Sequence, residues 1–529
     1  MRAILMTLFA ATVLSLTLGC TKKKKADYDL DLTSTLRINI STEPPSLDWN
    51  KSTDTTSALI QDNVMEGLVE YKLDDPKLGL KPALATEWRS ENNNQVWYFK
   101  IREGVNWTDG QALTAQQFID GWQRLLTPAT ASEYAYFLYG IKGARAFNEG
   151  KLTDFGQVGA SITDTGELKV ELTSPTAYFP YLLTHHSTYP IRLDVIAKHG
   201  DQWTEPGKIV TLGAFTLKVW DHDKAVVLER NEAYYGEKAK VKHILAYMIN
   251  ELSTALNLFN AGKIDAQTSL PSTELRELRK RSEFRETGIL SIYYYGFNVK
   301  KPPLDNPTVR KAISHAIDRK EITQMLDGGQ IPLTSWVPPG MFGYEPNTGT
   351  EFNVDKAKEM LDKAGYKDRS KFPKIEIGFN TNDDHKRVAE NIQAQLKRNL
   401  GVDVELKNEE WKVYLKSLQT DPPHIFRLGW LADYPDPDNF LNLMTSYSEN
   451  NHTQWGSKKF DDLIEKAVGL ATQEMREEVY NQAQKLLTEE EVPVAPIYAS
   501  VAHSLVAPRV VNFPFNSMQR YIFKEVSLK

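Results

Sequence analysis

The chain has 529 residues, with 63 lysines and arginines against 69 aspartates and glutamates, which gives a formal net charge of −6. This acidic balance, without a basic stripe or a recognised motif, argues against a nucleic-acid-binding protein. The single cysteine excludes a disulfide within the chain. A sequence of this length rarely folds around one core, so we expect two or three lobes.

The N-terminus has the pattern of a secretory signal peptide over residues 1–19. Arg2 supplies a positive charge, residues 3–18 are apolar or small, and a glycine precedes Cys20. The apolar stretch is shorter than the roughly 20 residues of a transmembrane helix, which disfavours an uncleaved anchor. We expect Cys20 to carry a lipid such as palmitate, as in bacterial lipoproteins, although Thr17 stands where their processing motif usually has leucine. A signal peptide without lipidation is the alternative.

Residues 20–35 are mostly polar and charged, which predicts a lipidated tether. After the tether, strand and helix patterns alternate through the first half of the chain. Strands are expected at 36–41, 96–101, 168–172, 215–217, 225–228, 243–249 and 264–268, and helices at 57–68, 114–126 and 254–260.

The second half alternates more regularly, which predicts a compact α/β lobe of its own. Strands are expected at 291–298, 374–380, 402–406, 425–430 and 492–497, and helices at 306–317, 355–364, 388–399, 411–418, 459–470 and 474–487. Asn306 and Pro307 are a helix start signal, with asparagine as the cap and proline at the first helical position.

The sequence lacks the usual enzyme signatures. It has no H-E-x-x-H, no G-x-S-x-G, no P-loop and no G-x-G-x-x-G. The adjacent pair His185 and His186 predicts a surface or loop feature rather than a metal site, because zinc needs ligands that converge.

Three carboxylates stand close together, at Asp433, Asp436 and Asp438. A calcium loop of the EF-hand type is disfavoured because its glycine and distal glutamate are absent. Paired glycosidase carboxylates are a second possibility. In a third interpretation, Asp436 or Asp438 has a purely structural role as the N-cap of the helix that follows.

Asp433 fits a ligand role best. It follows the apolar strand 425–430, and ligand clefts in open α/β lobes lie at the carboxyl ends of strands. Trp430 and Tyr434 flank it, so its carboxylate is suited to hold a cationic ligand group between aromatic walls.

Several segments carry a family resemblance, in chain order and over essentially the whole mature chain. They include PSLD at 45–48, FKIR at 99–102, WTDG at 107–110, YYYGFN at 293–298, VRKA at 309–312 and RLGWLADY at 427–434. With these segments the chain resembles the oligopeptide-binding proteins of bacterial peptide ABC transporters, which are family 5 extracellular solute-binding proteins.

The resemblance implies an α/β, bilobal periplasmic-binding-protein (flytrap) fold with an extra inserted subdomain. The expected lobe I comprises residues 36–65, 190–291 and 502–529. The inserted subdomain, the second part, comprises residues 66–189, and the third part, lobe III, comprises residues 292–501. A peptide would lie extended between the lobes and pair its backbone with protein strands. Backbone pairing is blind to side chains and so permits many peptide sequences.

The resemblance also implies an exported binding protein without catalysis or cofactors. It would capture short peptides and deliver them to the permease subunits of an ABC importer. We expect a periplasmic or cell-envelope monomer, held at a membrane by the lipid on Cys20. The alternatives are a peptide or glycan hydrolase that uses the three carboxylates, and a receptor of the same fold for cell-wall or signalling peptides.

Matching positions suggest roles for single residues. Asp433 would pair with the peptide's α-ammonium through a charge-assisted hydrogen bond. Arg427 and His385 would receive the peptide carboxylate at different ligand lengths. The remaining expected peptide contacts are the flanking backbone at Thr53, Asp54, Thr55 and Gly429, the aromatic walls Tyr134, Tyr294, Trp411 and Trp430, and Asn380.

Other positions depart from the family or are left in the core. Asp327 stands where some relatives carry a lysine, which removes one basic anchor and predicts a different preference for peptide length. Gly296 replaces an acidic residue. Trp97 and Phe99 are assigned to core packing.

Overall fold

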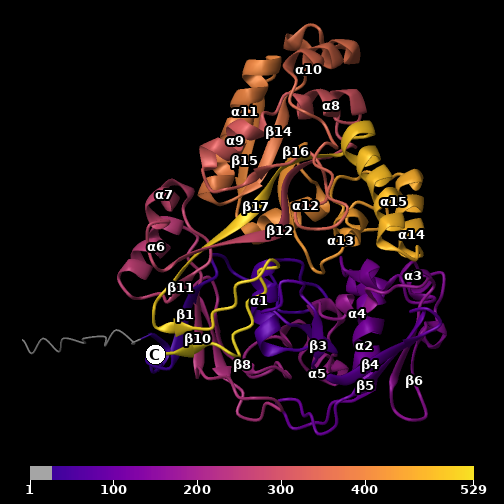
Figure 1. The fold of residues 1–529 in the computed structure, drawn as a ribbon, viewed down its shortest axis with the longest axis vertical. Helices are drawn as coiled ribbons and strands as arrows, with labels where there is room; N and C mark the ends of the chain where they lie inside the picture. Colours follow the sequence, from indigo (N-terminus) through magenta and orange to yellow (C-terminus); the bar gives the residue numbers. More distant parts are fainter. Residues whose placement is uncertain (1–26) are drawn as a thin grey trace, which may run out of the picture.

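The computed structural model describes residues 27–529 (Figure 1). The predicted signal peptide, Cys20 and the tether up to residue 26 lie outside the described residues. Within 27–529, no helix is both long enough and apolar enough to cross a membrane.

One mixed sheet of eleven strands runs through both halves of the molecule, in the order β15-β14-β16-β12-β17-β11-β1-β10-β9-β8, with β13 paired to β17. Its strands are β1 (Thr35–Asn39), β8 (Phe215–Asp221), β9 (Ala225–Arg230), β10 (His243–Tyr247), β11 (Ala266–Gln267), β12 (Phe284–Phe297), β13 (Ile331–Pro332), β14 (Ile375–Asn380), β15 (Val404–Glu409), β16 (Ile425–Leu431) and β17 (Val494–Val506).

The antiparallel pair β12 and β17 connects the two halves. Phe284 faces Leu505 at one end of the pair and Gly296 faces Val494 at the other, with a register shift after Gly288. At the end of the pair that holds Phe284 and Leu505, β17 also pairs with β11. Toward the end that holds Gly296 and Val494, β12 also pairs with β16. In Figure 1 the pair passes from the lower half, which holds the indigo and magenta segments, to the orange upper half.

The region between α1 (Thr55–Val64) and β8 forms smaller sheets of its own. Its four-stranded antiparallel sheet has the order β4-β5-β7-β6, and a separate hairpin pairs β2 with β3. These strands are β2 (Val69–Tyr71), β3 (Leu80–Pro82), β4 (Ala85–Glu91), β5 (Val96–Ile101), β6 (Ala160–Ile162) and β7 (Leu168–Glu171); near the C-terminus, β18 (Val510–Val511) pairs with β19 (Ser527–Leu528).

Helices cover the sheets on both sides. In the lower half they are α2 (Ala115–Leu126), α3 (Ala144–Asn148), α4 (Phe179–Leu182), α5 (Leu193–His199), α6 (Leu252–Asn260) and α7 (Leu275–Leu278). In the upper half they are α8 (Pro307–His315), α9 (Arg319–Leu326), α10 (Val354–Leu361), α11 (Asp383–Leu400), α12 (Trp411–Thr420), α13 (Pro437–Asn442), α14 (Lys458–Val468) and α15 (Gln473–Lys485).

Local capping explains where helices near the site begin. Asn306 accepts a hydrogen bond from the backbone of Thr308, so α8 begins at the predicted proline. Asn382 accepts from the backbone of Asp384 and His385, so α11 begins five residues earlier than predicted. This earlier start places His385 in the first turn of the helix, at the edge of the sheet.

The two faces of β12 belong to different cores. Tyr293 and Tyr295 pack in the cluster formed with α8, α9 and α11, whereas Tyr294 packs in the large cluster that also contains α12 side chains. Trp97 and Phe99 are buried in that large cluster, as predicted. Side chains along β12 therefore alternate between the two cores.

Candidate functional site

A cavity of about 550 Å³ lies where the two halves of the molecule meet. Its wall draws on residues far apart in the chain, including 53–56 near the start of α1 and 518–521 near the C-terminus. β12, β16, α11 and α12 contribute from the other side. The cavity therefore needs both halves, and it lies beside the β12–β17 pair.

Asp433 lies in the wall of the cavity, just beyond the end of β16. Its Oδ2 accepts hydrogen bonds from Asn439 Nδ2 at 3.1 Å and from the Tyr134 hydroxyl at 3.4 Å. Asp436 caps α13 and thereby fixes the first turn that carries Asn439. Burial raises the pKa of the Asp433 carboxyl to about 6, and the hydrogen bond from Asn439 opposes this rise.

Two histidines lie beside Asp433. His185 Nε2 is 3.4 Å from Asp433 Oδ1, and the ring of His186 packs against that of His185 at a tilt of 39°, with centroids 4.0 Å apart. Both side chains are buried and line the cavity, so the expected surface location was wrong. Burial lowers the pKa of both imidazoles well below the usual range and keeps them neutral.

No lysine or arginine in residues 27–529 lies within 4.0 Å of the Asp433 carboxylate. Arg520, which also lines the cavity, instead pairs with Asp62 at 3.2 Å. Asp433 is therefore a well-held carboxylate without a cationic partner, and it is able to accept one from a ligand.

The other two carboxylates of the cluster have structural roles. Asp436 caps α13 and pairs with Arg476 at 2.6 Å, as the capping interpretation predicted for one of the pair. Asp438 accepts a hydrogen bond from the Tyr434 hydroxyl at 2.7 Å. Neither lines the cavity. Across the part of the chain that the structure describes, no group of three or more His, Cys, Asp or Glu residues is arranged to hold a metal ion.

Arg427 also lines the cavity and lies on β16, six residues before Asp433. Its guanidinium lies 4.5 Å from the centroid of the Tyr293 ring, and its Nη1 donates to Asn380 Oδ1 at 3.0 Å. Its Nε is buried without a hydrogen-bond partner, and no carboxylate in residues 27–529 forms an ion pair with it. His385 Nδ1 is 3.4 Å from the Tyr293 hydroxyl, and burial holds the pKa of His385 well below its usual range.

Most of the predicted binding residues gather around this one cavity. Those that line it are Thr53, Asp54, Thr55, Tyr134, Asn380, His385, Trp411, Arg427, Gly429, Trp430 and Asp433. Asp54 also caps α1 by accepting from the backbone of Thr56 and Ser57. The indole of Trp430 donates to Asn439 Oδ1 at 3.0 Å, which links the aromatic wall to the residue that holds Asp433.

Tyr294 lies away from the cavity, in contrast to its predicted place in the wall. Its ring packs edge-to-face on Trp336 with centroids 4.9 Å apart, and it is buried in the core. Its neighbour Tyr293 lines the cavity instead. The sequence places three tyrosines in a row, and strand alternation alone does not say which of them faces the ligand. The burial of His185 and His186 could not be predicted from the local sequence either, because it depends on distant segments.

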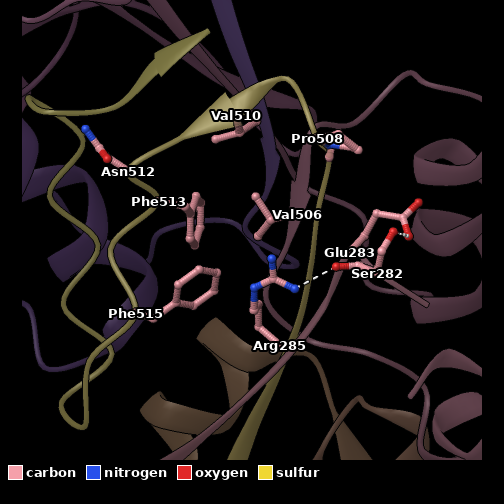
Figure 2. A pocket seen from close by; sticks show the side chains of 10 residues that line it. Ser282, Glu283, Arg285, Val506, Pro508, Val510, Asn512, Phe513 and Phe515 are labelled. Atoms are coloured by element: carbon pink, nitrogen blue, oxygen red, sulfur yellow. Dashed lines mark hydrogen bonds between the residues drawn. The ribbon is translucent and has the colours of Figure 1, made fainter. Parts of the chain in front are cut away.

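A second, smaller cavity of about 360 Å³ lies at the ends of β12 and β17 (Figure 2). Figure 2 shows Arg285 between Glu283 and the rings of Phe513 and Phe515, and its Nη1 donates to the carbonyl of Ser282 at 2.7 Å. None of the predicted binding residues lines it. The two cavities are therefore separate, and the predicted chemistry belongs to the first.

The fold and the charged interlobe cavity are those of a solute-binding protein. The family described as "Bacterial extracellular solute-binding proteins, family 5 Middle" matches residues 79–452, which is more than half of the chain. The chain belongs to the family 5 extracellular solute-binding proteins.

Individual relatives cover nearly the full length. The oligopeptide-binding protein OppA of Bacillus subtilis is 37% identical over 482 residues, which are 88% of this chain and 87% of that protein. The solved structure of the Haemophilus influenzae OppA complex with the peptide RPPGFSPFR has a TM-score of 0.89 and 28% identity, covering 94% of this chain and 99% of that one.

One relative has been solved in two arrangements. The Escherichia coli murein tripeptide binding protein MppA matches with a TM-score of 0.90 and 31% identity, covering 94% of this chain and 99% of that one. The unliganded open form of MppA covers the same 94% of this chain and 98% of its own, yet its TM-score is only 0.63. The two MppA structures match this chain with the same identity and nearly the same coverage, so the difference between their TM-scores lies in how the halves are arranged. The present structure has the arrangement of the first form rather than the open one.

Proposed function

We propose that this protein captures short peptides in the interlobe cavity and delivers them to an ABC importer. The observation that carries the proposal is a pair of opposite charges in the wall of one cavity, Asp433 and Arg427, each without an ion-pair partner of opposite fixed charge in residues 27–529. A peptide is a zwitterion whose α-ammonium and carboxylate complement these two charges. Relatives whose names state peptide binding support the same conclusion.

The spacing of the two charges favours peptides of a few residues. Arg427 lies on β16 and Asp433 six positions later. At about 3.3 Å per residue this corresponds to at most about 20 Å, because β16 ends at Leu431, and the reach of the arginine side chain must be subtracted. Gly429 lies between them and leaves room for a peptide backbone to approach the strand. Tri- to pentapeptides fit this geometry, with the strand-like pairing expected for β-augmentation.

A hydrolase is not favoured. Paired carboxylates are what the alternative needs, but Asp436 and Asp438 are occupied by Arg476 and Tyr434 outside the cavity. Of the other carboxylates that line the cavity, Asp62 pairs with Arg520, Asp384 pairs with Arg387, and Asp54 caps α1. Asp433, beside neutral histidines, therefore has no second free carboxylate of the kind that glycoside hydrolysis requires.

The lobe boundaries given above are part of the proposal. Lobe I would comprise 36–65, 190–291 and 502–529, the insertion 66–189, and lobe III 292–501. Under this division, ligand entry requires the halves to separate by bending of the β12–β17 pair. Such hinge closure around a ligand is a common mode of domain motion.

Export and anchoring complete the proposal. Cleavage before Cys20 and lipidation of its thiol would hold a monomer at a membrane, where the permease subunits are. Mass spectrometry of the mature N-terminal peptide tests this: a diacylglyceryl mass on Cys20 is expected, and an unmodified N-terminus would refute the anchor.

Native mass spectrometry of protein purified from cells tests the central proposal. Co-purified peptides of about three to five residues are expected, as estimated from the strand spacing. Added tri- to pentapeptides should also raise the melting temperature, because a ligand that binds only the folded state stabilises it. Co-purification of a non-peptide ligand, with no thermal shift from any peptide, would overturn the proposal.

A further inference from the structure

Glu133 of the lower half is held by residues of the upper half. Gln419 Nε2 donates to its Oε1 at 2.5 Å, Asn450 Nδ2 donates to its backbone carbonyl at 3.0 Å, and His452 Nε2 lies 3.8 Å from its Oε2. Gln419 lies in the last turn of α12, while Asn450 and His452 belong to the loop after α13. These contacts therefore bridge the two sides of the cleft.

The bridge stands at the rim of the cavity. Asn450 and His452 line the cavity, as does Tyr134, the residue after Glu133. Because an arrangement like the open form of MppA separates the halves, these contacts exist only when the halves are together. Glu133 thus passes from water into a buried contact each time the cleft closes.

Glu133 enters this contact without a counter-charge. In residues 27–529 no lysine or arginine forms an ion pair with it, and its side chain is only 12% exposed. The groups that face it are the amide of Gln419, the imidazole of His452, and at longer range Lys416 and Glu449. Burial lowers the pKa of His452 to about 4, so this neighbour is neutral. An ionised carboxylate is costly in such a place, whereas a protonated one is not.

We propose that Glu133 is a proton-linked latch, which takes up a proton when the halves close and releases it when they open. The latch rests on the proposed function, since peptide binding is what drives closure. Its neutral form keeps the hydrogen bond with the Gln419 amide, and its ionised form favours the open cleft.

The direction of the effect follows from linkage. Burial raises the pKa of Glu133 from 4.5 to about 7 on closure. Closure is therefore favoured as the pH falls through 7 and disfavoured above it. Between pH 8 and pH 6 the closed state, and with it peptide affinity, should gain about tenfold. Near pH 7 about half a proton should be taken up for each peptide bound.

Calorimetry with tri-alanine tests the latch, because titrations at pH 7 in two buffers of different ionisation enthalpy give the number of protons taken up. The wild-type protein should take up about 0.5 proton more than Glu133→Gln, whose amide imitates the neutral acid. Glu133→Gln should also lose the tenfold change in affinity between pH 8 and pH 6. Equal proton uptake by the two proteins would overturn the latch.

A matched control is Glu465→Gln. Glu465 also bridges the halves, through Arg145 at 2.8 Å, but it is 52% exposed. This variant should keep the wild-type proton uptake. If instead the pH effect in the wild type appears only with Ala-Lys-Ala and not with tri-alanine, Glu133 contacts a ligand side chain and the latch is wrong. Absence of peptide binding at every pH would refute the proposed function rather than the latch, and small-angle scattering would then still report whether acid alone closes the cleft.

Discussion

The two oppositely charged side chains in the cavity wall, Asp433 and Arg427, are held in different ways. Asp433 is enclosed by Asn439 of its own half and by Tyr134 and His185 of the other, so its carboxylate is held from both sides when the halves are together. Arg427 lies flat on Tyr293 with one buried donor left without a partner. Under the proposed roles, Asp433 would fix the ammonium end of a ligand strictly, while Arg427 would tolerate several positions of the carboxylate end. A site with one strict end and one tolerant end suits peptides of more than one length.

Removing the Asp433 carboxylate should have the largest effect on peptide affinity. Asp433→Ala should weaken binding of a free-amine tripeptide by about 2–5 kcal/mol, because the buried ammonium is left without its partner. Isothermal titration calorimetry measures this loss. An N-acetylated tripeptide is the control: it should bind wild type and variant equally weakly. Equal loss for both peptides would mean that Asp433 supports the fold rather than the ammonium.

Removing the Arg427 guanidinium should weaken peptide binding less. Arg427→Met should weaken binding by about 1.5–3 kcal/mol, the usual contribution of a hydrogen bond to a charged group. Calorimetry with a C-terminally amidated peptide provides the comparison, since the amide has no carboxylate for Arg427 to hold. If amidation and the Arg427→Met change have additive effects, the guanidinium does not receive the carboxylate.

The Asp433 carboxylate should also respond to pH. Burial raises the pKa of Asp433 to about 6 when the halves are together, so in this arrangement the carboxylate becomes neutral as the pH falls below that value. Affinity for free-amine peptides should then drop by up to about tenfold per pH unit below 6. This trend opposes that of the latch, so it is best measured in the Glu133→Gln protein. An affinity that stays flat from pH 7 to pH 5 would contradict it.

The smallest expected effect separates two adjacent tyrosines. Tyr293→Leu should weaken peptide binding by about 0.5–1 kcal/mol, because Arg427 loses the aromatic face that supports it. Tyr294→Phe should leave affinity unchanged, because its ring packs on Trp336 away from the cavity. The reverse order of effects would mean that the alternation of β12 is shifted by one residue in solution.

Much of the site around Asp433 could be predicted from the sequence. The apolar run of β16, followed at once by Asp433, indicates a strand that ends in a polar ligand-binding residue. Asp436 has the spacing of a helix cap. Both signals are local, and the structure has β16 and the cap of α13 where they predict them.

The rest depended on contacts between distant segments. β12 begins seven residues before its predicted start, because the exposed Arg285 and Glu286 conceal a strand that pairs with β17. His185 and His186 are covered by aromatic residues from elsewhere in the chain. Glu133 meets Gln419 across 286 positions, and no sequence pattern indicates such a pairing.

The wall of the cavity includes residues 53–56 and 518–521, which lie near opposite ends of the chain. In a protein exported N-terminus first, as proposed, residues 518–521 cross the membrane long after residues 53–56. A partly translocated chain has no complete site and holds no ligand. The topology thus prevents the protein from carrying cytoplasmic peptides outward during its own secretion, so its first ligand is one found outside.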